Sequence, residues 1–212
     1  MKCGKFITFE GPEGAGKSTQ IRLLGEFLNR SGIDCLITRE PGGTPLAEEL
    51  RTIVKSFSGS ETVHPETELL LMEAARSQHT GEVIAPALQA GKWVLCDRFS
   101  DSTTAYQGGA RGMDLEMIAT LNRFASKGCT PDLTILMDLT PEAGFARAAK
   151  RQETQGEHDR FEQEKIDFHH KVRAAFLNCA VKEPERFRIV DADRSIEEIH
   201  REITEIVTES LR

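Results

Sequence analysis

The sequence lacks the features that mark several other classes of protein. It has no excess of basic residues: 34 Asp and Glu against 27 Lys and Arg give a net charge of −7, which argues against a nucleic-acid-binding face. No apolar run approaches the roughly 20 residues of a membrane span, and no charged-then-apolar segment precedes the first motif. Without internal repeats, low-complexity tracts or linkers, residues 1–212 are expected to form a single domain.

Cysteine and histidine are too scattered to indicate a metal centre. The five cysteines show no C-x-x-C spacing, so we interpret them as reduced thiols rather than a disulfide framework or zinc site. The six histidines form no metal-spaced cluster, and His169 and His170 belong to a charged helical segment. We therefore expect the histidines on solvated faces.

One motif near the start organises the chain: Gly11-Pro12-Glu13-Gly14-Ala15-Gly16-Lys17-Ser18. It fits G-x-x-x-x-G-K-[ST], a loop whose backbone N–H groups can wrap nucleotide phosphates. Residues 5–10 are typical of a short buried strand, and residues 18–29 of an amphipathic helix whose N-terminus favours an anion. The motif predicts a bound nucleoside triphosphate, and with reduced thiols it predicts a cytoplasmic protein.

The rest of the chain alternates between short apolar strands and helices. Further strands are expected at 33–38, 92–97, 133–139 and 186–191. Helices are expected at 44–57, 67–90 and 113–126, after Thr140-Pro141, from about residue 159, and around Ile196 to Val207. This alternation predicts an α/β fold with a five-stranded parallel sheet covered by helices on both faces.

Candidate ligand-binding residues follow the ends of these strands, where open α/β sheets bind their ligands. Arg39-Glu40-Pro41-Gly42-Gly43-Thr44 follows the second strand, although alone it is better interpreted as a plain turn. Asp97 ends the third strand, which suits a carboxylate near phosphates and Mg²⁺. Arg98 comes next, and beside a phosphate loop we favour a phosphate-binding arginine over a surface ion pair.

A second cationic region lies far along the chain. Arg147, Lys150 and Arg151 precede a polar stretch, 152–158, and Arg160 follows it. Such a segment is typical of a lid that closes on phosphates, at approximately 147–162. On composition alone, a solvated loop between two helices is the stronger interpretation.

Together these pieces resemble the bacterial thymidylate kinase family over nearly the full length. The resemblance rests on residues 9–18, 38–44 and 97–99, on 102–109, and on Asp159-Arg160-Phe161-Glu162. It implies a P-loop nucleoside monophosphate kinase fold with a short lid, and a homodimer built partly from long helices. The implied reaction transfers the γ-phosphoryl group of ATP to the 5′-phosphate of dTMP, with Mg²⁺ as cofactor.

The resemblance also implies a role for each matching residue. Lys17 would neutralise the β- and γ-phosphates, and Ser18 and Asp97 would hold Mg²⁺. The ATP loop would comprise Gly11, Pro12, Glu13, Gly14, Ala15, Gly16, Lys17, Ser18 and Thr19. The residues implied to bind dTMP are Glu13, Arg39, Met72, Arg76, Arg98, Ser102, Thr103, Tyr106 and Gln107.

Within the implied dTMP site, Arg98 and Arg39 would grip the acceptor phosphate. Glu13 would meet the deoxyribose 3′-hydroxyl, and Tyr106 would pack against C2′ and exclude a ribose hydroxyl. Arg76 would contact the thymine edge. Ser102 and Thr103 would line the base pocket.

Two positions depart from what is common in the family. Gly14 stands where some relatives carry an arginine, so the cation that stabilises the transferring phosphoryl group would come from the lid. Arg147, Lys150, Arg151 and Arg160 are candidates, and we favour Arg151 and Arg160 as catalytic beside Lys17 and Arg98. Met72 stands where the family usually has a phenylalanine that stacks on thymine; methionine can cover a base but lacks the planar surface.

Two other functions compete with this one. A P-loop kinase acting on a different nucleoside monophosphate, or on a deoxynucleoside, would share most of the motifs. A nucleotide switch would signal through loop ordering. A GTPase normally reads guanine through Asn-Lys-x-Asp, but no asparagine of this chain (Asn29, Asn122, Asn178) is followed by Lys.

Overall fold

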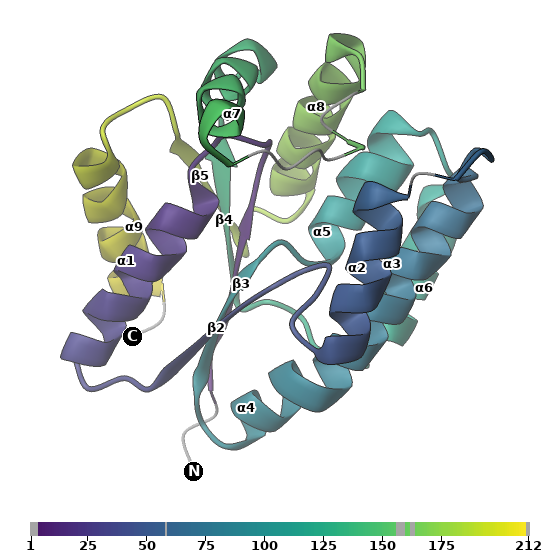
Figure 1. Ribbon diagram of the computed structural model, residues 1–212. Helices are drawn as coiled ribbons and strands as arrows, with labels where there is room; N and C mark the ends of the chain where they lie inside the picture. The colour runs from purple at the N-terminus through teal and green to yellow at the C-terminus, as the bar shows by residue number, and fades with distance from the viewer. Residues whose placement is uncertain (1–3, 58, 156–159, 162–163, 211–212) are drawn as a thin grey trace.

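Five parallel strands form the centre of the molecule. The structure is a computed structural model that describes residues 4–57, 59–155, 160–161 and 164–210 (Figure 1). The strands pair in the order β2-β3-β1-β4-β5. Each lies within two residues of its predicted bounds, so the five-stranded parallel sheet is confirmed. Their bounds are β1 (Phe6–Glu10), β2 (Cys35–Arg39), β3 (Trp93–Asp97), β4 (Leu133–Asp138) and β5 (Phe187–Asp191).

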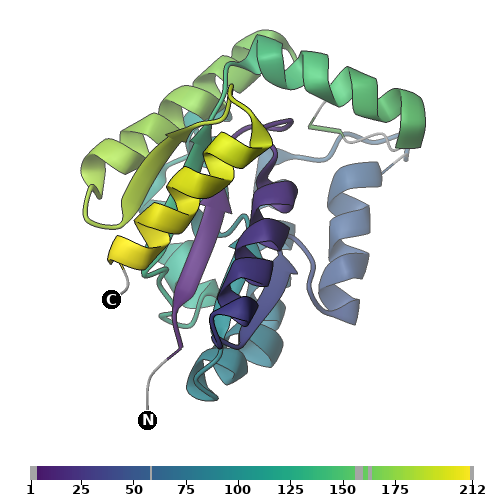
Figure 2. The same ribbon diagram turned by 90° about the vertical axis from the view of Figure 1, so that its left-hand side faces the viewer.

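Helices cover both faces of the sheet, as predicted. On one face, α1 (Lys17–Arg30) and α9 (Ile196–Ser210) pack together (Figures 1 and 2). On the other face lie α3 (Pro65–His79), α4 (Ala85–Gln89), α5 (Ser100–Thr103) and α8 (Ile166–Lys182). Helices α2 (Pro45–Ser56) and α6 (Leu115–Ala125) pack against α3, and α7 (Pro141–Gln155) packs beside α8.

The central strand is buried on both sides. All five residues of β1 are buried, which is what a strand between two layers of helices requires. Ile7 and Phe9 belong to a core that also contains Leu24 of α1 and Ile203 of α9. Phe6 joins a second cluster with Val94 and Phe99 on the opposite side. The carboxyl edge of the sheet is therefore a rigid platform for the loops that follow β1 and β3.

The helix expected at 67–90 is interrupted. The structure divides it into α3, a wide π-helical turn (Thr80–Ile84) and α4. Pro86 lies just beyond the wide turn and has no backbone N–H to donate to the carbonyl four residues earlier. The sequence pattern located the helical region correctly, but not its change of pitch.

The donor-rich stretch after Phe99 is helical, which the sequence did not predict. It forms α5 and a second π-helical segment (Thr104–Ala110), which packs against α8. Gly109 permits this contact, because a Cβ there would lie 2.3 Å from the Cβ of Ala175. The sequence does not predict this helix because two adjacent glycines and two threonines have low helix propensity.

Candidate active site

The glycine-rich loop connects β1 to α1, as predicted. Gly14 has a left-handed backbone (φ 76°) and packs on α7, where a Cβ would lie 2.5 Å from the carbonyl oxygen of Gly144. A side chain at position 14 would collide with this backbone. The absence of an arginine from the loop therefore has a packing cause.

Lys17 turns its ammonium group back onto the loop. Its Nζ donates to the carbonyl oxygens of Pro12 at 2.8 Å and Gly11 at 3.2 Å, and the side chain is buried. Burial, together with the nearby charge of Arg98, lowers the pKa of Lys17 to about 8. Phosphate oxygens placed in the loop would offer a stronger partner for this ammonium and would raise its pKa again.

Ser18 and Asp97 meet at the head of α1. The Ser18 hydroxyl donates to Asp97 Oδ2 at 2.8 Å, because β1 and β3 are neighbours and pair Phe9 with Asp97. Hydroxyl and carboxylate oxygens suit Mg²⁺, which usually keeps several waters and takes only one or two protein ligands beside substrate phosphates. Across the described residues no group of three or more His, Cys, Asp and Glu could hold a metal.

Arg98 follows β3 in a left-handed conformation (φ 70°) that is uncommon for a residue with a side chain. Its guanidinium donates to Ser102 Oγ at 3.1 Å, lies 3.6 Å from a carboxylate oxygen of Glu13, and stands over the Tyr106 ring. Burial acts to lower the pKa of Arg98, but Tyr106 and the nearby carboxyl groups together outweigh it and raise this pKa. The group is a fixed cation that faces the loop.

Arg76 is held by a buried network. It is 3% exposed and donates to Glu40 at 2.8 Å, to Glu73 at 2.6 Å and to Asn122 at 2.8 Å. The other oxygen of Glu40 contacts His79 Nδ1 at 3.0 Å. Such a network fixes the guanidinium in one orientation, which is what recognition of a planar base edge requires.

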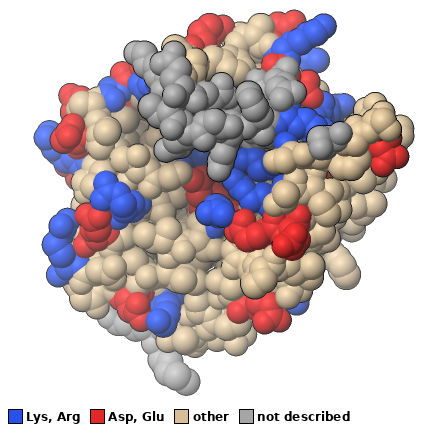
Figure 3. All heavy atoms as spheres, in the orientation of Figure 1, with Lys and Arg blue, Asp and Glu red and all other residues tan. Residues whose placement is uncertain are grey.

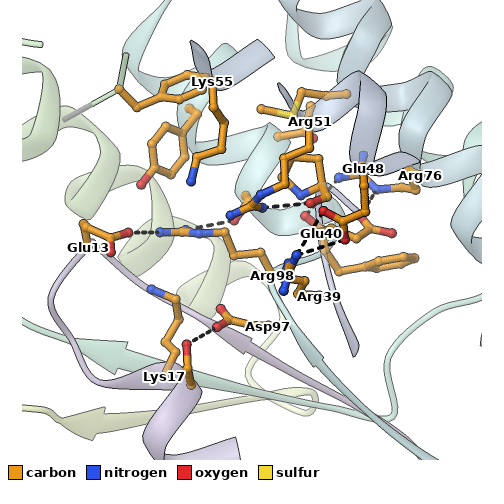
Figure 4. A pocket seen from close by; sticks show the side chains of 18 of the residues that line it. Glu13, Lys17, Arg39, Glu40, Glu48, Arg51, Lys55, Arg76, Asp97 and Arg98 are labelled. Atoms are coloured by element: carbon orange, nitrogen blue, oxygen red, sulfur yellow. Dashed lines mark hydrogen bonds and ion pairs between the residues drawn. The ribbon is translucent and has the colours of Figure 1, made fainter. Parts of the chain in front are cut away.

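These elements surround one cavity of about 900 Å³. Basic side chains gather in the hollowed face in Figure 3, and Figure 4 shows Arg98 reaching toward Glu13 above Lys17 and Asp97. The cations that line the cavity are Lys17, Arg39, Arg51, Lys55, Arg76 and Arg98. An acidic chain thus concentrates positive charge where two phosphorylated substrates could meet.

The structure brings together all the residues expected to bind dTMP. Glu13, Arg39, Met72, Arg76, Arg98, Ser102, Thr103, Tyr106 and Gln107 line the cavity. Of the expected ATP loop, Gly14, Gly16, Lys17, Ser18 and Thr19 line it as well. Gly11, Pro12 and Ala15 are buried and are not among its lining residues.

Helix α2 contributes side chains that sequence reasoning missed. Glu48, Arg51, Thr52 and Lys55 line the cavity at helical spacing. Glu48 binds Arg39 through both carboxylate oxygens at 2.9 and 3.0 Å, and Arg51 donates to the Pro41 carbonyl at 2.8 Å. Their i, i+3/i+4 spacing indicates that the four side chains share one face of the helix. The spacing does not indicate whether that face lies toward the cavity or toward solvent.

The expectation that the histidines are solvated is wrong for two of them. His79 is completely buried and its Nε2 lies 2.6 Å from the Thr38 hydroxyl. His169 is 5% exposed and lines the cavity, where burial lowers its pKa. In both cases tertiary packing overrides the polar neighbourhood in the sequence.

The lid arginines do not line the cavity in the described part of the chain. Arg147 donates to the Ala192 carbonyl and to Asp193, each at 2.8 Å. Arg160 donates to the Val54 carbonyl at 3.1 Å and to Glu68 at 2.6 Å, and its expected catalytic role stays a prediction. The side chains of Lys150 and Arg151, and the lid residues 156–159, lie outside the described residues.

Comparison with known proteins decides the family. A family model described as thymidylate kinase matches residues 9–203. The chain belongs to the thymidylate kinase family. It is 52% identical to thymidylate kinase from Pseudomonas putida (strain GB-1) over 200 residues, covering 94% of this chain and 93% of the relative. A crystal structure of thymidylate kinase from Ehrlichia chaffeensis matches with a TM-score of 0.77 and 33% identity, covering 97% of this chain and 99% of that chain.

The comparisons confirm the expected family and reaction. Thymidylate kinase from Desulfosudis oleivorans is 50% identical to this chain over 190 residues, with 88% of each chain covered. The activity of the thymidylate kinase family is a kinase reaction, the phosphorylation of dTMP to dTDP with ATP. Among the described helices, none is both long enough and apolar enough to cross a membrane.

Proposed function

We propose that this cavity carries out the thymidylate kinase reaction by in-line transfer of the γ-phosphoryl group of ATP to the 5′-phosphate of dTMP, in the synthesis of dTTP. The observation that carries the proposal is that the phosphate loop and Arg98 line one cavity, with Arg98 directed toward Glu13 of the loop. Phosphoryl transfer needs little covalent chemistry from the protein. Positioning and charge neutralisation would supply the catalysis.

On the donor side, Lys17 would leave the carbonyl oxygens of Gly11 and Pro12 and bind the β- and γ-phosphates. Ser18 and Asp97 would hold Mg²⁺, and the oxygen-only character of this pair supports that assignment. Bound there, Mg²⁺ would neutralise negative charge on the phosphate oxygens. Loop residues from Gly11 to Thr19 would donate backbone N–H groups to the same phosphates.

On the acceptor side, Arg98 and Arg39 would bind the 5′-phosphate and reduce its repulsion from the donor phosphates. Glu13 would accept from the 3′-hydroxyl, and Tyr106 would lie against C2′. Arg76 would read the thymine edge, its rigid placement by Glu40 and Glu73 supporting this role. Met72, Ser102, Thr103 and Gln107 would line the base pocket.

The final catalytic cation would come from the lid, approximately residues 147–162, within one kinase domain of residues 1–212. Gly14 cannot carry a side chain against Gly144, which supports a source outside the loop. Arg151 and Arg160 are our candidates, and Arg147 and Lys150 are alternatives. An arginine in this position can increase the rate about a thousandfold or more.

We also propose a homodimer. Ile53 of α2, Leu70 of α3 and Phe124 of α6 expose 46%, 59% and 79% of their surface, and these three helices are neighbours in the fold. Exposed apolar side chains on adjacent helices are suited to burial against a second copy. Light scattering at micromolar protein concentration tests this, and a monomeric mass would contradict it.

A cytoplasmic location is part of the same proposal. Cys35, Cys96, Cys129 and Cys179 are free thiols, as a reducing compartment would maintain them. Burial raises the pKa of Cys96 and Cys179, the latter to about 12, so these thiols resist oxidation. Cell fractionation with an antibody to the chain tests the location; recovery in an envelope or secreted fraction would contradict it.

A comparison of acceptors tests the function. In a coupled assay of ADP release, dTMP should give the highest kcat/KM, with dUMP, UMP and thymidine each lower. Thymidine lacks the phosphate that Arg98 would bind, and UMP carries the 2′-hydroxyl that Tyr106 would exclude. ADP release that is equally fast without any acceptor would indicate an ATPase or a nucleotide switch. A preference for UMP or thymidine would indicate a different small-molecule kinase.

A further inference from the structure

Glu10 ends strand β1 immediately before the phosphate loop, and its side chain is completely buried. A buried carboxylate is unfavourable unless hydrogen-bond donors satisfy it. Both oxygens of Glu10 have partners on the segment that follows β3. Oε1 accepts from the backbone N–H of Phe99 at 2.7 Å, and Oε2 is hydrogen-bonded to the hydroxyl of Ser102 at 2.6 Å.

These contacts, with those of Phe9, fix the backbone around Arg98. The N–H of Arg98 donates to the Phe9 carbonyl at 2.9 Å, and the next N–H, that of Phe99, is the one bound by Glu10. The thiol of Cys96 donates to the Arg98 carbonyl at 3.0 Å. A residue other than glycine keeps a left-handed conformation only where its surroundings hold it. Of the three contacts described here that hold the backbone of Arg98, strand β1 supplies two, those of Phe9 and Glu10.

Glu10 also reaches the guanidinium of Arg98 through one hydroxyl. Arg98 Nη1 donates to Ser102 Oγ at 3.1 Å, and the Ser102 hydroxyl is in turn hydrogen-bonded to Glu10. The carboxylate of Asp101, on the same segment, is turned to Arg186 at 2.7 and 2.9 Å. The Arg98–Ser102 pair therefore contacts the carboxyl group of Glu10 on its interior side. On the other side, Glu13 of the loop faces Arg98.

We propose that Glu10 is a positioning residue for the acceptor phosphate: it holds Arg98 in its left-handed conformation and directs its guanidinium into the cavity. This inference rests on the proposed role of Arg98 in binding dTMP. Glu10 does not line the cavity among the described residues, so it would act through Arg98 rather than by direct contact with a substrate. Because Glu10 lies one residue before the loop that receives ATP, it ties the acceptor-binding arginine to the donor-binding strand.

A double-mutant cycle distinguishes positioning from general stabilisation. Calorimetry measures the dissociation constant of dTMP for the full chain and for E10A, R98A and E10A/R98A. We expect E10A to weaken dTMP binding about tenfold, and the double variant to bind dTMP within twofold of R98A, because Glu10 has nothing left to position. Additive losses, or unchanged affinity in E10A, would overturn the inference. Unchanged affinity in R98A would overturn the role of Arg98 in the proposed function, and the inference with it.

Two further measurements guard against loss of folding. ATP affinity should stay within about twofold in E10A; a loss equal to that of dTMP would mean that the loop has collapsed and would overturn the inference. Thr8→Val is a matched control, because Thr8 is also fully buried on β1 and pairs with Thr134 at 2.8 Å, away from the cavity. It should lower thermal stability and leave both affinities unchanged. If E10A does not fold, Glu10→Met, which fills the same space and removes both oxygens, takes its place in the same cycle with the same expected outcome.

Discussion

Arg160 donates a hydrogen bond of 2.6 Å to Glu68, a carboxylate that is 1% exposed. Gln107, which lines the cavity, donates to the same carboxylate at 2.8 Å, and Arg111 contacts it at 3.2 Å. Arg160 is therefore held beside Gln107, on the side of the cavity where we propose that dTMP binds. For Arg160 to stabilise a transferring phosphoryl group, it must exchange Glu68 for phosphate oxygens.

The lid arginines should act mainly on the rate. Replacing Arg151 and Arg160 together by alanine should lower kcat about a hundredfold or more, because their charge would matter most in the transition state. Steady-state kinetics with ATP varied at saturating dTMP measures this. A loss of ATP affinity that matches the loss of kcat would mean that these residues bind the ground state instead.

Arg147 offers a matched control for that experiment. It belongs to α7 and donates to the Ala192 carbonyl and to Asp193. We expect Arg147→Ala to change kcat less than threefold. A decrease as large as that of the double variant would assign the catalytic role to Arg147.

Glu10 should make stability depend on pH. Burial, with the charge of Asp101, raises its pKa from an ordinary value near 4.5 to about 8. The folded state thus keeps a proton that the unfolded chain releases, so the contribution is fully present below pH 4.5 and is lost as pH rises through 8. One such proton corresponds to at most about 1.4 kcal/mol per pH unit. Urea unfolding between pH 5 and 7.5 should show a flatter profile for Glu10→Gln, and an unchanged slope would contradict this assignment.

Met72 should contribute to base binding. It lines the cavity and packs against the cluster that contains Phe176 and Leu136. Met72→Ala should raise the KM for dTMP about tenfold, because an apolar contact worth about 1.4 kcal/mol is lost. Met72→Phe should lower the KM by adding a planar surface. If Met72→Ala leaves the KM for dTMP unchanged, Met72 does not line the thymine site.

The sequence was most informative where one short-range pattern determines the structure. Apolar runs bounded by turn residues located β1 and β3, and the spacing of Gly11, Gly16 and Lys17 located the phosphate loop. Because parallel strands end at one edge of the sheet, the sequence alone predicts that Asp97 and Arg98 lie beside that loop.

Features that depend on tertiary packing could not be read in this way. The burial of His79 follows from its partners Glu40 and Thr38, which are distant in sequence. The inward direction of Arg51 depends on how α2 packs on α3. The role we infer for Glu10 rests on contacts with residues about ninety positions later in the chain. From the sequence alone, Glu10 is identified only as the last residue of a strand.

The central claim is that one cavity binds ATP through the loop and dTMP through Arg98. Calorimetric titration of the Arg98→Ala variant with each nucleotide tests it most directly. We predict that dTMP affinity falls about a hundredfold, as expected for the loss of charge-assisted hydrogen bonds to phosphate, while ATP affinity stays within about threefold. Unchanged dTMP affinity, or an equal loss for both nucleotides, would contradict it.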